Sequence, residues 1–344
     1  MRYVGIDYHK RYFVATVMDE EGKVIRKDMV STDRRCIRDY FKEINSDGDV
    51  KAVLEACYEW SYFYDEIKGM VKEVKLAHPL KTRLIAEARI KTDSIDSDAL
   101  AHLLRADLIA EAHAPEFEVR QNKNVLRYRT SLVKIRGMLK NKIHAVLARN
   151  HIEEREFREL SDKFGKMGRR YMRGFELRGG DTEILNHYLD LIEAMDKKMK
   201  VVNKKIRETV KGDEICELLD SAPGVGDILA MAIRYEIDDI ERFLTSKKLC
   251  SYSGLIPSTY SSGGKTYQGK ITKQGNKWLR WAMTEAAQNA IKKDPGLRSF
   301  YQRVAKRRGK NRAKIAVARK LLEIIYRIWK EGRSYYENTV AVAL

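Results

Sequence analysis

The sequence predicts an α/β domain at the amino terminus and a mainly α-helical structure over the rest of the 344-residue chain. In the first part, short apolar runs of strand length alternate with helix-length amphipathic segments, which is typical of α/β domains. Further along, apolar residues recur every three to four positions, and this spacing indicates helices. A second helical pattern begins at residue 213. We therefore expect three domains, at 1–115, 116–212 and 213–344.

Five strands and three helices are expected in the first domain. The strands are the apolar runs at 3–8, 11–18, 24–30, 51–56 and 74–79. The helices are the segments at 33–45, 61–73 and 91–109. The Glu20-Glu21-Gly22 turn joins the second and third strands as a hairpin, and Pro79 stops the fifth strand. Three strands in a meander, followed by alternating helices and strands, predict a mixed sheet.

Two long apolar seams predict coiled-coil helices in the second domain. The first seam consists of Val125, Tyr128, Leu132, Ile135, Leu139 and Val146. The second consists of Leu185, Tyr188, Ile192, Met195, Met199, Val202, Ile206 and Val210. The basic, glycine-rich segment 162–181 between them suits the tip of a helical hairpin. The seams fit a hairpin that closes on itself and a hairpin that joins two copies of the chain equally well.

The third domain opens with a Pro-Gly-Val-Gly turn between two apolar helices. This arrangement is similar to a helix-hairpin-helix element, in which glycines let backbone N–H groups approach a phosphate. Gly224 and Gly226 are therefore candidate phosphate-binding residues, although a plain turn uses the same residues.

The charge of the chain points to a polyanionic partner. Lysines and arginines number 67 against 49 acids, which gives a formal net charge of +18 at pH 7 and favours a nucleic acid over a small acidic substrate. No window approaches the ~18–20 apolar residues of a membrane span, so we expect a soluble, intracellular protein with no membrane partner. The four cysteines lack CxxC spacing, which argues against a zinc site or a disulfide framework.

Four acids form a candidate metal site. Asp7 and Glu55 each lie near the end of an apolar strand, and Asp93 and Asp96 share one face at the start of a helix. If the two strands are neighbours, four carboxylates suit two Mg²⁺ ions about 4 Å apart, the arrangement for phosphodiester chemistry. Each acid also has an ordinary role: a strand end for Asp7, a pair with Lys51 for Glu55, a helix cap for Asp93 and a favourable first-turn charge for Asp96.

A serine-containing loop is the second candidate for chemistry. Ser261 and Ser262 precede two glycines, and the flanking cations are Lys265, Lys270, Lys273, Lys277 and Arg280. Such a serine can attack a phosphodiester, because cations stabilise the alkoxide and the charge that develops on the phosphate. The residues alone favour the simpler role of contacting backbone phosphates, since no histidine or acid stands beside the serines in sequence to act as a base.

The remaining candidates are a basic strip and four aromatic or imidazole side chains. The strip lacks acids and consists of Lys306, Arg307, Arg308, Lys310, Arg312 and Lys314; it predicts a nucleic-acid contact. Trp278 and Trp281 are expected to anchor the core, although base stacking is an alternative. His9 and His78 lie near the acidic edge and are expected to be structural.

The order and spacing of these motifs resemble the DEDD transposases of the IS one-ten group, relatives of the Piv and MooV invertases, over nearly the full chain. The resemblance rests on "GIDYHK", "VLEA", "HP" at 78–79 and "KTDSIDSDALA" in the first domain, and on "APGVGDILA", "RFLTSKKLCSYSGLIP", "SSGGK" and "GKITKQGNKWLR" in the last. It implies a RuvC-like, ribonuclease-H-type first domain and a carboxy-terminal transposase domain. It also implies a prokaryotic, cytoplasmic protein associated with the nucleoid.

The resemblance assigns roles position by position. It makes Asp7, Glu55, Asp93 and Asp96 the acidic tetrad for Mg²⁺, and it makes Ser262, with Ser261 in reserve, the nucleophile that forms a phosphoserine link to DNA. It further implies a recombinase of donor and target DNA that is directed by a structured RNA from the element's ends. Members are expected to be dimers or tetramers in which the serine of one subunit completes the acidic site of another, which favours a dimerising helical hairpin.

One departure from the family pattern concerns the acidic helix. Relatives commonly read KTDxxDA, whereas Ser97 replaces the alanine here and Asp98 adds a further acid. Because Asp98 lies two positions after Asp96 on a helix, we expect it to point away from the metal site. Two other functions stay open at this point: a RuvC-like nuclease or junction resolvase that uses water, and a nucleic-acid-binding scaffold without activity.

Overall fold

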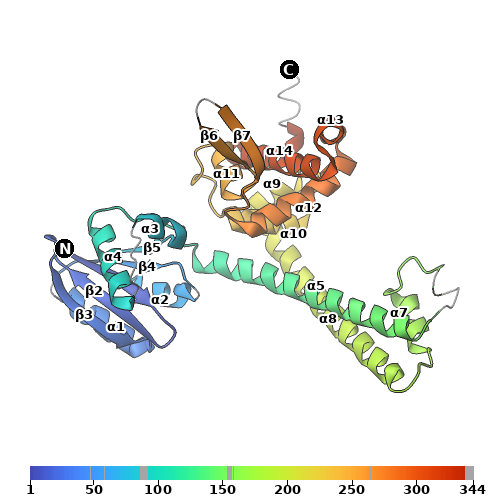
Figure 1. Ribbon diagram of the computed structural model, residues 1–344, viewed down its shortest axis with the longest axis horizontal. Helices are drawn as coiled ribbons and strands as arrows, with labels where there is room; N and C mark the ends of the chain where they lie inside the picture. The colour runs from blue at the N-terminus through green and yellow to red at the C-terminus, as the bar shows by residue number, and fades with distance from the viewer. Residues whose placement is uncertain are drawn as a thin grey trace. The chain divides into compact units, whose positions relative to one another are not determined.

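The computed structural model describes residues 1–46, 48–57, 59–85, 92–152, 157, 159–262 and 265–337. The chain forms two compact units, Met1–Ala114 and Pro115–Leu344. In Figure 1 the first unit runs from blue to teal and the second from green to red. The expected further division at residue 212 stays a prediction.

The first unit contains the mixed five-stranded sheet that the sequence predicts. Its strands are β1 (Arg2–Tyr8), β2 (Tyr12–Met18), β3 (Val24–Ser31), β4 (Val50–Glu55) and β5 (Glu73–Ala77), in the order β3-β2-β1-β4-β5. The first three are antiparallel neighbours, and β4 and β5 continue the sheet parallel to β1. This order is consistent with a ribonuclease-H-like fold.

Helices cover both faces of this sheet. The helices of the unit are α1 (Arg34–Asn45), α2 (Trp60–Ile67), α3 (Pro79–Ile85) and α4 (Asp93–Arg105), and α1, α2 and α4 pack against strands. Alternate strand residues point to opposite faces, and those on one face, such as Ile6 and Leu54, pack with α1 and α2. On the other face Val53 packs with Leu100 of α4. The carboxy-terminal ends of β1 and β4 thus lie beneath the start of α4.

Three helix boundaries in this unit differ from the prediction, and one of them is the end of the helix expected at 91–109, which the structure places at Arg105. The helix expected at 61–73 ends at Ile67, because a turn follows in which the Met70 amide donates to the Ile67 carbonyl at 2.9 Å. Pro79 does stop a strand, but it also begins α3, a position that suits proline because the first helical amide has no intrahelical partner.

Two long helices dominate the start of the second unit (Figure 1). They are α5 (Phe117–Arg149) and α8 (Asp181–Lys211), and they pack along one another. All eight positions expected in the seam of α8 are buried in the two cores or packed against them. The seam expected on α5 is wrong at Tyr128 and Ile135, which are exposed, while Leu126 is buried.

The expected hairpin tip has structure of its own. Residues 162–181 include a short helix, α7 (Lys166–Arg173), which packs against α8. Phe164, Met172 and Phe175 are buried there in a small core with the ends of the long helices. The burial of these three residues was not predicted, because the segment is basic and rich in glycine.

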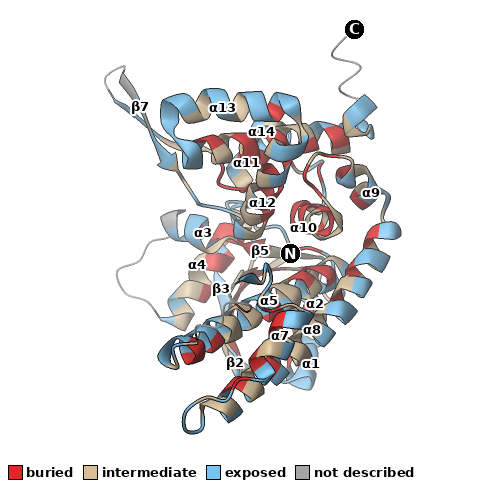
Figure 2. Ribbon diagram, turned by 90° about the vertical axis from the view of Figure 1, so that its right-hand side faces the viewer, coloured by how far each residue is buried: buried red, intermediate tan, exposed pale blue. Residues whose placement is uncertain are grey.

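The rest of the second unit is mainly helical around one core. Its helices are α9 (Glu214–Asp220), α10 (Asp227–Ile237), α11 (Ser246–Tyr252), α12 (Lys277–Lys293), α13 (Pro295–Arg308) and α14 (Lys310–Glu331). Figure 2 shows buried residues on the facing sides of α10, α12 and α14. Between α11 and α12 lies an antiparallel hairpin that was not predicted, β6 (Pro257–Ser262) and β7 (Lys265–Ile271). Among the described residues, no helix has the length and apolar character of a membrane span.

Candidate functional site

The parallel pairing of β1 and β4 brings two of the predicted acids to one edge of the sheet. Gly5 pairs with Val53 and Ile6 with Leu54, so Asp7 and Glu55 are the next residues of their strands. Asp7 lies two positions after Gly5, and Glu55 lies two positions after Val53. Because alternate strand residues share a face, both acids point to the α4 face. Lys51, the alternative partner of Glu55, lies 2.6 Å from Glu73 instead.

A close helix-to-strand contact places the other two acids nearby. A Cβ atom on Gly5 would lie 2.1 Å from the Ser97 carbonyl oxygen and 2.4 Å from the Ala101 nitrogen, so only glycine lets α4 approach β1 this closely. The helix is capped by Thr92, whose side chain accepts from the Ile95 amide. The ordinary alternative for Asp93, that it caps this helix, is therefore wrong.

Three side chains form the centre of the site: Asp7, His9 and Asp93. Their ligand atoms all lie within 4.8 Å of one another. His9 Nε2 is 3.1 Å from Asp7 Oδ2 and 3.3 Å from Asp93 Oδ2. Tyr12 donates its hydroxyl to Asp93 at 3.0 Å. Both acids were predicted from the sequence, whereas His9 was expected to be structural and Tyr12 was not predicted.

The electrostatics of this cluster fit a divalent cation. Burial is the main reason that the pKa of Asp7 is raised above its usual range; the His9 ring lowers it, and the charges of Asp93 and Asp96 raise it further. Crowded carboxylates are relieved by a bound cation, and carboxylate oxygens with an imidazole nitrogen are ligands that such ions accept. The residues present therefore fit a metal.

The other members of the predicted tetrad lie at the margin of this cluster. Asp96 is close enough to Asp7 to raise its pKa. Glu55 and Asp7 both raise the pKa of Cys57, although burial raises it most. Neither Asp96 nor Glu55 places a carboxylate oxygen within the 4.8 Å group.

Asp98 takes the orientation expected from its spacing. It pairs with Lys27, and it accepts from Thr16 Oγ1 at 2.8 Å. Ser97, which stands where relatives carry alanine, is buried and its hydroxyl lies 2.9 Å from the Thr16 hydroxyl. This pair of hydroxyls satisfies the additional polar group under the helix.

The serine candidates lie on the unpredicted hairpin. Ser261 and Ser262 are the last residues of β6, both exposed, and they pair with Thr266 and Lys265 of β7. Gly263, Gly264 and the side chain of Lys265 lie outside the described residues. Lys270 and Lys273 are exposed near the base of the hairpin.

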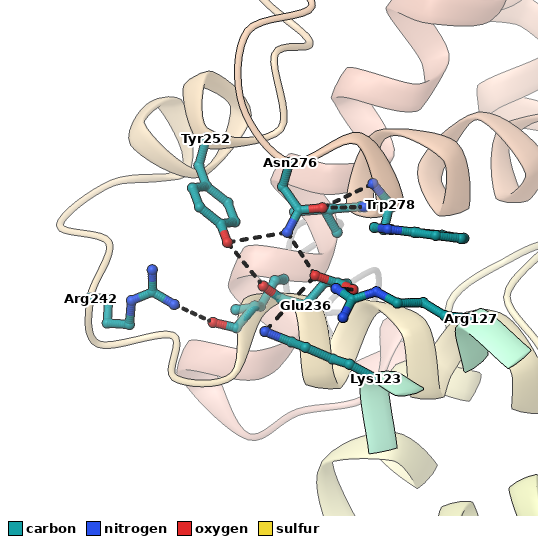
Figure 3. Close-up of polar contacts among 9 residues, drawn as sticks. Lys123, Arg127, Glu236, Arg242, Tyr252, Asn276 and Trp278 are labelled. Atoms are coloured by element: carbon teal, nitrogen blue, oxygen red, sulfur yellow. Dashed lines mark hydrogen bonds and ion pairs between the residues drawn. The ribbon is translucent and has the colours of Figure 1, made fainter. Parts of the chain in front are cut away.

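A buried polar network supports the base of this hairpin (Figure 3). Glu236 of α10 is 4% exposed, and Asn276, the residue that caps α12, donates to its Oε2 at 2.8 Å. Lys123 and Arg127 of α5 lie 3.9 Å and 3.2 Å from the same carboxylate. Tyr252 receives a second bond from Asn276 at 3.1 Å. Sequence reasoning found none of these residues, because they come from four distant segments.

The predicted glycine turn has a clear packing role. Gly224 has φ +85°, and a Cβ there would lie 2.4 Å from the Ala286 carbonyl oxygen of α12, so glycine is needed for the turn to meet this helix. Gly226 begins α10 as its cap and lines a hollow of about 400 Å³ with Arg207 and Lys293. The assignment of the two glycines to phosphate binding stays a prediction.

The predicted basic residues divide into exposed cations and one brace. Lys306, Arg307, Arg308, Lys310 and Arg312 are exposed where α13 meets α14. Arg280 instead donates to the Ser253 carbonyl at 2.8 Å and holds α11 to α12. Of the two tryptophans, Trp281 packs against the core and Trp278 lies under the Arg127 guanidinium.

Comparison with known proteins adds the family context. A model of IS110-type DEDD transposases, described as a transposase, matches residues 4–152, and a model described as the transposase IS116/IS110/IS902 family matches residues 216–302. The two regions together span more than half of the chain.

Three relatives illustrate the similarity. The transposase for insertion sequence element IS1111A of Coxiella burnetii is 26% identical over 97% of this chain and 91% of its own. A probable family 20 transposase of Pseudomonas aeruginosa is 22% identical over 96% of this chain and 98% of its own. The pilin gene-inverting protein of Moraxella bovis is 25% identical over 76% of this chain and 74% of its own.

Proposed function

Because the chain belongs to the IS110/IS116/IS902 family of transposases, which are DNA-processing enzymes that use divalent metal, we propose that it cuts and rejoins donor and target DNA through a metal-assisted serine nucleophile. The proposed metal ligands are Asp7, Glu55, Asp93 and Asp96, and the proposed metal is Mg²⁺. The proposed nucleophile is Ser262. The observation that carries most weight is the convergence of Asp7 and Asp93 within one 4.8 Å group.

The protein residues have distinct parts in the proposed reaction. Mg²⁺, when bound, supplies positive charge that stabilises the developing charge on a phosphodiester. Ser262 Oγ forms a bond to phosphorus, and the bond from phosphorus to one deoxyribose oxygen breaks. The serine hydroxyl gives up its proton and the leaving deoxyribose oxygen takes one up, so this exchange balances. In the second step a DNA hydroxyl loses its proton and bonds to the phosphorus, the bond from serine Oγ to phosphorus breaks, and the serine oxygen takes up a proton. We propose that Lys270 of β7, whose side chain is exposed, helps to neutralise phosphate charge.

The His9 ring contacts both acids of the cluster. Its Nε2 lies 3.1 Å from Asp7 Oδ2 and 3.3 Å from Asp93 Oδ2, so the ring can orient both carboxylates. We infer that His9 supports the metal ligands and that Tyr12 fixes the orientation of Asp93 through its 3.0 Å hydrogen bond.

Two further parts of the proposal concern partners. We propose that a structured RNA transcribed from the element's ends directs the choice of DNA; the resemblance and the net charge of +18 support this. We also propose a dimer or tetramer that is joined through the α5–α8 hairpin. Val133 and Met138 of α5 and Val201 of α8 are exposed there, at 42%, 62% and 70%, and exposed apolar side chains on helices favour a partner surface.

The test is a search for a covalent protein–DNA adduct. Purified wild-type, Ser262→Ala, Ser261→Ala and Asp7→Ala proteins are incubated with element-end DNA, the flanking RNA and Mg²⁺, then run on a denaturing gel. We expect an adduct in the wild type and in Ser261→Ala, and none in the other two. An adduct that persists in Ser262→Ala but not in Ser261→Ala would move the nucleophile to the neighbouring serine.

The alternative is a metal-dependent nuclease that uses water. The placement of His9 beside two carboxylates favours it, since these groups can activate water without the serine hairpin. It predicts free cleaved ends without an adduct, lost in Asp7→Ala and retained in Ser262→Ala. That outcome would exclude the serine mechanism.

A further inference from the structure

Helix α8 carries a row of cations on one face of its carboxy-terminal half. Lys197, Lys200 and Arg207 are exposed and separated by three and seven positions, which places them on one side of a helix. From Lys197 to Arg207 the row is about 15 Å long, at about 1.5 Å per residue. Lys204 lies on the same side and pairs with Glu208 at 3.8 Å.

The row continues into a hollow between α7 and α8. This hollow has a volume of about 620 Å³ and is lined by Lys166 and Arg170 of α7 together with Lys197 and Lys200 of α8. Asn203 lines this hollow and also the 400 Å³ hollow that contains Arg207. The cations thus follow a continuous concave surface, which we call the α7–α8 basic groove.

The acids near this groove are already occupied. Asp196 pairs with Arg136 at 2.6 Å and with Arg169 at 2.9 Å. Asp190 and Glu193 both pair with Arg173. In the part of the chain that the structure describes, Lys166, Arg170, Lys197, Lys200 and Arg207 have no ion pair. Uncompensated cations in a row are the electrostatic footprint of a polyanion.

We propose that the α7–α8 basic groove binds the phosphodiester backbone of duplex DNA. Its row of about 15 Å equals the axial rise of about four base pairs, so several phosphates can meet successive side chains. A long, linear groove suits a polymer better than a single phosphate. The partner is DNA because the chain is a transposase, whose substrate carries this backbone.

The groove is separate from the residues proposed for chemistry. No residue of the groove belongs to the acidic cluster or to the serine hairpin. The groove was not predicted, because the basic composition of segment 162–181 also suits a simple turn. Binding here is independent of base sequence, because lysine and arginine contacts to phosphates fix position and carry no direct sequence readout. The groove would therefore hold flanking DNA while other surfaces select the site.

The test compares two matched pairs of lysines on the same helix. Lys197→Gln/Lys200→Gln removes two charges from the groove, and Lys198→Gln/Lys205→Gln removes two exposed charges from the opposite side of α8. Affinity for a 30-base-pair DNA duplex and for an RNA duplex of the same sequence is measured by fluorescence anisotropy between 50 and 300 mM salt. Lys197→Arg/Lys200→Arg, which keeps the charge, is the rescue variant.

The groove pair is expected to lose about 10- to 30-fold in DNA affinity near 150 mM salt and to lower the slope of log affinity against log salt by about 1.8, since each phosphate contact contributes about 0.9. The control pair and the arginine pair should bind DNA within about twofold of wild type. Equal losses in both glutamine pairs, or a loss for RNA with DNA binding unchanged, would overturn the proposal. Neither result depends on whether Ser262 is the nucleophile.

Discussion

At the residue scale, the candidate site depends on a glycine, Gly5, as much as on the acids themselves. Gly5 brings the start of α4 against β1, and this contact sets the distance between Asp93 and Asp7. The acids of the two elements are 86 positions apart in sequence, so nothing local holds them together. The geometry of the cluster is therefore a property of the helix-to-strand contact.

Gly5→Ala is expected to destabilise the first unit and to reduce activity. The new Cβ would lie 2.1 Å from the Ser97 carbonyl oxygen, and overpacking of this kind costs about 1–3 kcal/mol. Because an error of about 1 Å in a reacting group can cost about 100-fold in rate, DNA cleavage should fall by more than the folded fraction does. Urea unfolding and single-turnover cleavage measure the two effects.

Gly137→Ala is the matched control. Gly137 lies within α5, and a Cβ there would meet no atom within 4 Å. Since alanine is the better helix former by about 0.5–1 kcal/mol, this variant should be at least as stable as wild type and fully active. A loss of stability in both variants would show that the Ser97 contact is not the cause.

Glu236→Gln tests the buried network under the serine hairpin. Removing this charge leaves the buried Lys123 and the nearby Arg127 without their carboxylate, and breaking one side of a buried pair costs about 3–5 kcal/mol. Burial already lowers the pKa of Lys123, so its amine can lose the proton and part of the cost can be relieved at high pH.

The double variant Lys123→Met/Glu236→Gln should recover part of this loss, because it removes the buried amine together with the carboxylate charge that pairs with it. Chemical unfolding of the four proteins of the cycle gives the coupling energy. Independent, additive effects of the two substitutions would contradict the network.

The sequence identified individual acids better than it identified their partners. Asp7 and Asp93 could be predicted because an acid after a short apolar strand and an acid in the first turn of a helix are local signals. The contact of His9 with Asp7 was not predicted, because it depends on the conformation of the turn between β1 and β2. Lys123 and Glu236 are 113 positions apart and meet only through packing of α5 against α10.

At the element scale, strands and long helices were predictable and short capped elements were not. The five strands match their predicted runs within about two residues, because apolar alternation is strong in a buried sheet. The β6–β7 hairpin escaped because its strands are exposed and polar, so they show no alternation. Helix α5 was predicted, but its seam was drawn through Tyr128 and missed Leu126.

The joint between α5 and α8 provides a pH-dependent prediction. Arg149, near the end of α5, and Asn150 both bind the Asp181 carboxylate at the start of α8. Arg149 is the main cause of a lowered pKa for Asp181. A carboxyl group whose pKa is lowered in the folded state stabilises the fold at pH values above its ordinary pKa of 3.8. This stabilisation is lost as the pH falls through the pKa of the folded state.

Asp181→Asn should therefore lower the Tm at pH 7, and the difference from wild type should shrink as the pH falls toward 3. Calorimetry at several pH values measures the difference. The control is Asp162→Asn, since Asp162 lies in the same connecting segment without a contact to Arg149. A difference between Asp181→Asn and wild type that stays constant from pH 7 to pH 3 would contradict the assignment.

At the scale of the whole molecule, acids and serines lie in different compact units. The acidic cluster belongs to Met1–Ala114 and the serine hairpin to Pro115–Leu344. The sequence predicted this separation through the order of the motifs. The resemblance implies that the serine of one subunit completes the acidic site of another, and a measurement on mixed subunits tests this expectation.

Mixing inactive Asp7→Ala with inactive Ser262→Ala should restore adduct formation if the serine of one subunit serves the acids of another. Random assembly of a dimer from equal amounts would place an intact acidic unit with an intact serine in about half of the complexes, as an order-of-magnitude expectation for an associating protein. Adduct is measured on a denaturing gel with subunits of different length. No activity in the mixture would indicate that each chain uses its own serine.

The register between β1 and β4 limits where residues can be inserted into or deleted from this protein. Asp7 and Glu55 share the α4 face because both strands keep the same pairing up to Ile6 and Leu54. A single inserted or deleted residue inside either strand would turn its carboxylate to the opposite face, against α1 and α2. The turn between β2 and β3 carries no such restriction. Natural or engineered insertions are therefore expected at 19–23 and excluded from 2–7 and 50–55, which can be read directly from a library of one-residue insertions selected for activity.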